Sequence, residues 1–109
     1  FTLLHFIHSI GGTDFISALP ITVAANTIYH LKIEIDSARK LSIFVDGQQY
    51  NITTTSGSTG GTAVTTGTTK SGAMTDDVDL IPYIGIEAGA AAAEAVDVHY
   101  QCISRTLFE

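Results

Sequence analysis

The sequence predicts an all-β protein, an antiparallel β-sandwich, and two observations carry this prediction. Apolar and polar residues alternate with a period of two in separate segments, as they do in strands that have one buried face. Segment 28–52 also reads as consecutive antiparallel strands, joined at Asp46-Gly47, a dipeptide typical of type I′ turns because both residues tolerate positive φ. Strands that share one apolar face need a second layer to cover it, and a sandwich supplies that layer.

The chain before this hairpin predicts three strands. Segment 3–10 is apolar on both faces apart from two histidines and a serine, so we expect it at the centre of a sheet. Gly11-Gly12 turns the chain. Two shorter strands are expected at 14–17 and 21–24, the second opened by Pro20, since proline is tolerated where a strand begins.

The apolar face of the hairpin predicts which of its residues are buried in the core. Its third strand is expected to run through Tyr50 and Ile52. Charged and polar residues occupy the alternate positions of its first two strands, which therefore have one solvated face. The residues expected on the apolar face are Tyr29, Leu31, Ile33 and Ile35 from the first strand, and Leu41, Ile43 and Val45 from the second.

Segment 53–72 is a threonine-rich arm, in which seventeen of twenty residues are Thr, Ser or Gly. Such a segment buries too little apolar surface to offset its ordering entropy by itself. Because threonine favours extended backbone, we interpret the segment as an arm that contacts a neighbouring subunit, with a mobile surface loop as the alternative. With two apolar residues at the C-terminus, the residues expected to contact a partner are Thr59, Thr62, Val64, Thr66, Leu107 and Phe108.

The C-terminal part predicts two further strands, at 80–87 and 95–105, separated by an Ala- and Gly-rich loop with at most one helical turn. In the last strand, alternation places Val96, Val98, Tyr100 and Cys102 inside. Cys102 is the only cysteine, so it cannot form an intrachain disulfide, and we interpret it as a small core residue rather than a nucleophile.

Length and composition indicate one domain over 1–109 and exclude several function classes. Charged residues make up only 15% of the chain, which indicates a surface partly covered by neighbouring subunits. The net charge is −6 and the five Lys and Arg are scattered, so we expect no nucleic-acid partner. No apolar run is long enough to span a bilayer. The chain opens at Phe1 in an apolar segment without signal-peptide features, and we expect it to be the C-terminal portion of a longer protein.

The segments 29–36 (YHLKIEID) and 41–47 (LSIFVDG) resemble the central strands of concanavalin A-like (laminin-G-like) jelly rolls. The segments 79–87 (DLIPYIGIE) and 98–105 are similar to the C-terminal strands of such domains in virion proteins of tailed phages. The resemblance covers about the last eighty residues and implies a jelly-roll fold. Such a fold needs more strands than this chain supplies, so we expect an N-terminal part to precede Phe1.

No constellation of residues predicts catalysis. Glu34 and Asp36 share one side of a strand, as do paired carboxylates in glycosidases of the concanavalin-like sandwich. Those enzymes carry a further acid three positions on, where this chain has Arg39, and there is no tryptophan to stack on a sugar. We therefore expect a solvated polar strand face, no catalytic residue and no enzyme.

No metal or cofactor site is predicted either. His5 and His8 lie three residues apart on a strand, so they point to opposite faces and cannot chelate one ion. Asp76, Asp77 and Asp79 could offer oxygen ligands to Ca²⁺, but their segment lacks a glycine-turned loop with spaced ligands. A solvated acidic loop is the favoured interpretation.

The resemblance implies a non-enzymatic virion structural protein, either a capsid decoration (cement) protein or a fibre domain on the surface of a phage particle. The expected partners are copies of itself, as a trimer, and other virion proteins. The alternative is a carbohydrate-binding, lectin-like module for host attachment, whose partners would be surface glycans. Fold resemblance by itself does not give function, so both remain expectations.

Overall fold

The computed structural model describes residues 3–57, 59–76, 98 and 101–104. By its contacts the chain divides into two compact units, Phe1–Asp77 and Val78–Glu109, and all but five of the described residues belong to the first. The single domain predicted over 1–109 stays a prediction. The strand expected at 80–87 and the loop after it lie outside the described residues.

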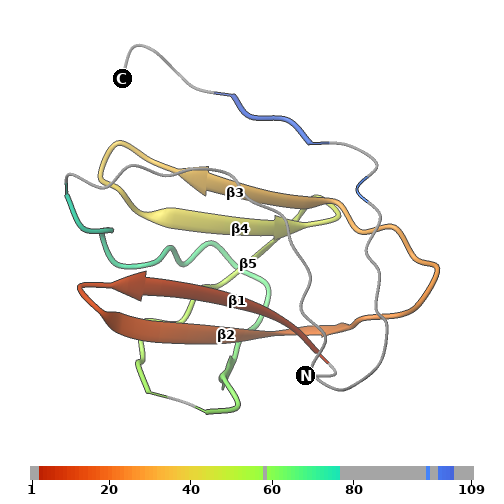
Figure 1. Cartoon of the computed structure of the whole chain (residues 1–109), viewed down its shortest axis with the longest axis horizontal. Coiled ribbons are helices and arrows are strands. Elements are labelled where there is room, and N and C mark those ends of the chain that lie inside the picture. Colours follow the sequence, from red (N-terminus) through yellow and green to blue (C-terminus); the bar gives the residue numbers. More distant parts are fainter. Residues whose placement is uncertain (1–2, 58, 77–97, 99–100, 105–109) are drawn as a thin grey trace. The chain divides into compact units, whose positions relative to one another are not determined.

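The first unit is all-β and consists of two antiparallel-rich sheets, consistent with the predicted β-sandwich (Figure 1). Every strand pair is antiparallel except that of β2 and β6, which is parallel. No helix occurs in the described part of the chain. One sheet has the order β1-β2-β6, with β1 (Leu3–Ile10), β2 (Thr13–Thr22) and β6 (Thr62–Ala63); the other has the order β3-β4-β5, with β3 (Leu31–Ile35), β4 (Leu41–Val45) and β5 (Gln48–Tyr50).

Strand β2 is one continuous strand, where two short strands were expected. The β1–β2 register passes from Leu3↔Thr22 to His5↔Ala18, so β2 has extra residues at this point. Pro20 is exposed and lies within this irregularity. Since proline lacks a backbone N–H, a bulge lets a strand continue through it, and the prediction of a break at Pro20 is wrong.

Among the described residues, strand β1 lies at the end of its sheet and pairs only with β2, so the expected central position is not met there. Its inner face is covered, as His8 is buried, but on the outer face Ile7 is 53% exposed. Apolar residues on both faces predict two covered faces, whereas the place of a strand in its sheet is decided by pairing. The composition of one strand does not determine its neighbours.

The tight turn of the hairpin is confirmed. Val45 pairs with Gln48, so the loop contains only Asp46 and Gly47, and their φ angles are 49° and 82°. Positive φ at both positions is what a type I′ turn requires. The third strand ends earlier than expected, at Tyr50, although the next apolar residue is still buried.

The core lies between the sheets and centres on β4. Leu41, Ile43 and Ile52 form its buried cluster and are each no more than 6% exposed. Burying such a side chain contributes roughly 1.5–3 kcal/mol, so these three stabilise the fold more than any single hydrogen bond. Partly buried side chains that pack against the cluster are Phe6, Tyr50 and Met74.

The apolar face of β3 is exposed, which contradicts the prediction for half of the hairpin. Leu31, Ile33 and Ile35 are 60%, 57% and 44% exposed. Their cross-strand partners Val45, Ile43 and Leu41 on β4 are all buried. The first sheet therefore covers the second as far as β4, and β3, the outermost strand of its sheet, extends beyond that cover (Figure 1).

Substitution of Gly47 tests the turn. No atom lies within 4 Å of an added Cβ, so Gly47→Ala should act through backbone strain alone. Because φ is +82°, we expect a loss of about 1 kcal/mol in the free energy of unfolding, measured by urea denaturation. Gly60→Ala is the matched control, since Gly60 has equal space and no positive φ. Equal effects of the two substitutions would contradict the assigned turn.

Candidate functional site

Glu34 and Asp36, the carboxylates that resemble a glycosidase pair, have structural roles. Glu34 forms an ion pair with Lys32 of the same strand at 3.0 Å, and both side chains are more than half exposed. Asp36 forms an ion pair with Lys70 at 2.9 Å. Among the described residues, no three His, Cys, Asp or Glu side chains could hold a metal ion together.

Asp36 organises the loop between β3 and β4. Its Oδ1 accepts hydrogen bonds from the backbone N–H groups of Ala38 and Lys40, each at 2.9 Å. The hydrogen bond from Lys70, and next the one from the Lys40 backbone, lower the pKa of Asp36 below its usual value. Such a carboxylate stays ionised and serves the turn, whereas a general acid needs a raised pKa.

Arg39, which stands where a glycosidase would carry an acid, has a structural role too. Its Nε donates to the carbonyl oxygen of Met74 at 3.0 Å, and its φ is 63°. The guanidinium therefore holds the residues just after the arm against this loop.

The two N-terminal histidines lie on opposite faces of β1, as predicted. His5 hydrogen-bonds through Nε2 to the carbonyl oxygen of Gly60 in the arm, at 3.2 Å. His8 is only 6% exposed and stacks between Phe6 and Phe15, with ring centroids 5.7 and 4.9 Å away. Neither ring nitrogen of His8 has a hydrogen-bond partner among the described residues. Burial lowers its pKa, so its neutral form is favoured.

Cys102 and Val98 are exposed, and the prediction that they face a core is wrong. The described residues 101–104 belong to no strand. Alternation gives a buried face only where a segment is paired into a sheet and a second layer covers it. Exposure makes Cys102 accessible to oxidants, but no second feature of the described residues makes it a site.

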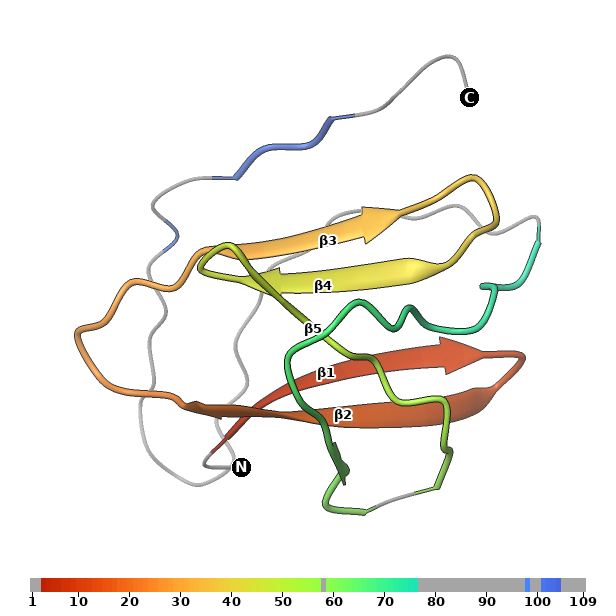
Figure 2. The same cartoon turned by 180° about the vertical axis from the view of Figure 1, so that it is seen from behind.

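The threonine-rich segment 53–72 folds back onto its own chain (Figure 2). Val64 donates its N–H to the carbonyl oxygen of Ala18 in β2, and Ser71 donates to that of Leu41 in β4, both at 3.0 Å. Within the segment, β6 pairs with β2. The arm thus gains backbone hydrogen bonds from both sheets and needs no second subunit for its order.

Two buried serines complete this attachment. Ser17 is fully buried, and its Oγ accepts the N–H of Thr53 at 3.0 Å. Ser71 is 2% exposed, and its Oγ accepts the N–H of Leu41 at 2.8 Å. Both serines satisfy backbone groups that would otherwise be buried without a partner. Sequence reasoning missed them because neither a single serine in an apolar strand nor one in a polar run has a distinguishing pattern.

The four described residues among those predicted to contact a partner differ in their exposure. Thr59 and Thr66 are exposed, whereas Thr62 and Val64 are half-buried against the chain's own sheet. Leu107 and Phe108 lie outside the described residues. Their contact with a partner stays a prediction.

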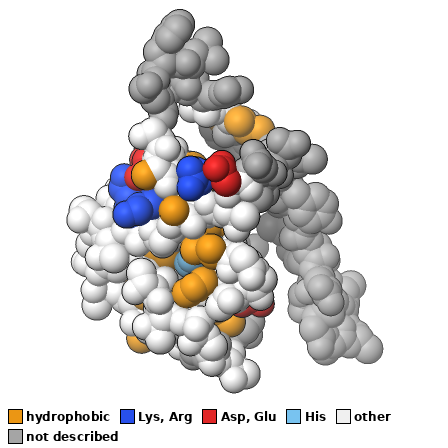
Figure 3. All heavy atoms as spheres, turned by 90° about the vertical axis from the view of Figure 1, so that its left-hand side faces the viewer, with side chains coloured by type: hydrophobic (Ala, Val, Ile, Leu, Met, Phe, Trp, Pro, Cys, Tyr) orange, Lys and Arg blue, Asp and Glu red, His pale blue; other side chains and the backbone are white. Residues whose placement is uncertain are grey.

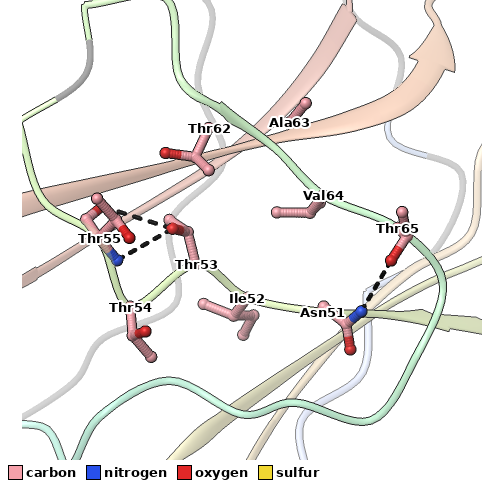
Figure 4. A pocket seen from close by; sticks show the side chains of 9 residues that line it. All are labelled: Asn51, Ile52, Thr53, Thr54, Thr55, Thr62, Ala63, Val64 and Thr65. Carbon is pink, nitrogen blue, oxygen red and sulfur yellow. Dashed lines mark hydrogen bonds between the residues drawn. The ribbon is translucent and has the colours of Figure 1, made fainter.

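A hydroxyl-lined hollow of about 280 Å³ lies between the two halves of this segment (Figure 4). Three of its polar side chains are already engaged: Asn51 donates to Thr65 Oγ1 at 3.0 Å, and Thr53 Oγ1 accepts the N–H of Thr55 at 3.1 Å. No aromatic side chain lines the hollow, so it lacks a stacking surface for a sugar. Its lining residues are Asn51, Ile52, Thr53, Thr54, Thr55, Thr62, Ala63, Val64 and Thr65.

A second, apolar groove of about 110 Å³ lies between the sheets, beside β1 and β3, the end strands of the two sheets in the described part of the chain. Leu31 and Ile33 form its outer part, and both are more than half exposed. On the face drawn in Figure 3, hydrophobic side chains of the described part gather around a histidine. The groove is lined by Leu4, His5, Phe6, Leu19, Leu31, Ile33, Ile43 and Val45.

No protein-family model, no curated protein and no solved structure matches this chain. Within the described part, no helix is long and apolar enough to cross a bilayer. In the described part of the chain, the exposed apolar face of β3 and the groove beneath it are the features that point to a function.

Burial of His8 predicts a pH dependence of stability. Because its folded-state pKa is below the ordinary value of 6.5, the unfolded state binds more protons once the pH falls below that value. Stability should therefore be constant above about pH 7 and fall from about pH 6.5 downward. The thermal unfolding midpoint, measured at a series of pH values between 7 and 5, reports this effect. Most carboxylates titrate below this range and therefore contribute little to the change.

His8→Leu keeps an apolar side chain of similar size between the two phenylalanines, and it should flatten this slope. His30→Gln, at an exposed position, is the control and should keep the wild-type slope. A slope that survives His8→Leu would show that another group causes it.

Asn51 holds the returning arm to β5. Its Nδ2 donates to Thr65 and to the Thr66 carbonyl oxygen, and its Oδ1 accepts the N–H of Thr69 at 3.0 Å. We expect Asn51→Ala to lower the free energy of unfolding by about 1–3 kcal/mol, measured by urea denaturation. Thr68→Ala, at an exposed neighbouring position, should change it by less than about 0.5 kcal/mol. Similar losses in the two variants would contradict the role of Asn51.

Proposed function

We propose that this chain is a non-enzymatic structural module of a phage particle, a capsid decoration or fibre domain that assembles with copies of itself and with other virion proteins. The observation that carries the assembly part is the apolar strip on β3. Leu31, Ile33 and Ile35 alternate along one exposed strand face and continue the buried face of β4. The phage assignment rests on the resemblance of segments 79–87 and 98–105 to the C-terminal strands of jelly rolls in virion proteins of tailed phages.

The energy of burial supports assembly. Each large aliphatic side chain contributes roughly 1.5–3 kcal/mol when it is fully removed from water. Three such side chains stand next to one another on β3, and together they offer several kcal/mol to whatever covers them. Low charge content supports the same proposal, since charged residues are depleted at interfaces.

A lectin-like module is the second candidate, and the threonine-lined hollow is the observation in its favour. Threonine hydroxyls and an asparagine amide can bond to sugar hydroxyls. The proposal of a structural module is preferred because the hollow has no aromatic lining and its amide is already used within the fold. A glycan array on the purified protein tests this alternative and should show no binding.

Proteomics of purified particles tests the virion proposal directly. Phage particles from the source culture, banded by density and digested with trypsin, should contain the peptides 41–70 and 71–105 of this chain. Both should rise and fall across the gradient together with the major capsid protein. Peptides confined to the soluble fraction would overturn the proposal, and a host-membrane fraction processed in parallel serves as the control for contamination.

A further inference from the structure

At the edge of β3 that no described strand occupies, three alternate residues point their backbone N–H and C=O groups outward. The carbonyl oxygen of His30 accepts the N–H of Asp46 at 2.8 Å, and Asp36 donates its N–H to Lys40 at 3.0 Å. Residues 30 and 36 thus bond toward β4, and in an antiparallel pair the bonding direction alternates along the strand. Leu31, Ile33 and Ile35 therefore direct their N–H and C=O groups away from β4, to an edge that no described strand occupies.

Two side chains of opposite charge flank Ile33 on β3. Lys32 precedes it and Glu34 follows it, and both side chains are more than half exposed. If a second copy pairs antiparallel with Ile33 opposite Ile33, Lys32 of each copy faces Glu34 of the other. These positions are non-hydrogen-bonded pairs, where cross-strand side chains approach most closely. An attractive charge pair therefore lies on each side of the two-fold axis.

Other registers lack this match. A two-fold axis centred on Lys32 would place lysine opposite lysine, and one centred on Glu34 would place glutamate opposite glutamate, which is destabilising. Shifting the register by one residue would turn the apolar strip of one copy to the opposite face. Only the register centred on Ile33 keeps both apolar faces on one side and pairs opposite charges.

We propose that two copies of this chain pair edge to edge through β3, about a two-fold axis at Ile33, to form one continuous six-stranded sheet. Leu31 of each copy then lies opposite Ile35 of the other, so each exposed aliphatic side chain gains an apolar neighbour. This inference rests on the proposed function and specifies its first interface. It makes a dimer the unit of assembly, in place of the trimer expected from the sequence.

Charge reversal with rescue tests the pairing. The Cys102→Ser background removes disulfide artefacts at the exposed cysteine. In that background, sedimentation velocity over a concentration series should show a dimer that dissociates on dilution, since a single strand edge is a small interface. Lys32→Glu or Glu34→Lys converts both attractive pairs into repulsive ones and should weaken dimerisation at least about tenfold. The doubly reversed variant should dimerise like the parent protein.

Mixing gives the decisive result. Lys32→Glu carries two glutamates on β3 and Glu34→Lys carries two lysines, so the two variants should form a one-to-one heterodimer although each is monomeric alone. Far-UV circular dichroism of each variant is the folding control. Because Lys32 and Glu34 are more than half exposed, the substitutions should not disturb the fold. A parent protein that is monomeric or trimeric at all concentrations, or a dimer unaffected by charge reversal, would overturn the inference.

Amide hydrogen exchange on the unmutated protein provides a second measurement. The N–H groups of Leu31, Ile33 and Ile35 should be protected at dimer concentrations and exchange faster after dilution, while core amides stay protected. Protection that persists in a monomer would mean that another segment of the same chain occupies the edge, and the inference would fail. If β3 does not pair but the peptides of this chain are present in purified particles, the proposed function is unaffected. If the peptides are absent from particles, the proposed function is wrong even if β3 pairs.

Discussion

The fold depends on the cover over the apolar face of β4. Leu41 and Ile43 pack with Ile52 in the core, and Phe6 from the first sheet packs against them. This contact ties the hairpin sheet to the β1–β2 sheet, and Met74, just after the arm, packs against the same cluster. Because the apolar face of β4 continues onto β3, the point where the cover stops also defines the surface that is left for assembly.

The threonine-rich segment shows how a chain orders residues that have little to bury. Its backbone bonds to both sheets, and Ser17, Asn51 and Ser71 supply side-chain bonds at the positions where the segment meets them. A single hydrogen bond contributes only about 0.5–1.5 kcal/mol net, so the segment is held by many small contributions. Close contact also matters, since a Cβ added at Gly67 would collide with the Asn51 amide.

The strand edges link the fold to the proposed assembly. A free edge with exposed aliphatic side chains invites pairing with another chain, and natural proteins commonly protect such edges with charged residues. Here Lys32 and Glu34 carry opposite charges on either side of Ile33. A strand edge of another sequence would lack matching charges, whereas β3 of a second copy supplies them. The cation of Lys32 also lies 4.5 Å from the ring centroid of Phe44, which keeps it along the sheet.

The local sequence determined the strands of the hairpin, the type of turn at Asp46-Gly47, and the opposite placement of His5 and His8, because each depends only on backbone period or on the conformational freedom of a few residues. It also identified Leu41, Ile43 and Val45 as core residues. Tertiary structure decided what local patterns do not encode: the continuation of β2 through Pro20, the edge position of β1, the attachment of the arm, and the exposure of Leu31, Ile33 and Ile35. The alternation of β3 is as regular as that of β4, yet one apolar face is buried and the other is open. The difference lies in how far the opposite sheet extends, and burial of a strand face is set by what covers it rather than by the strand itself.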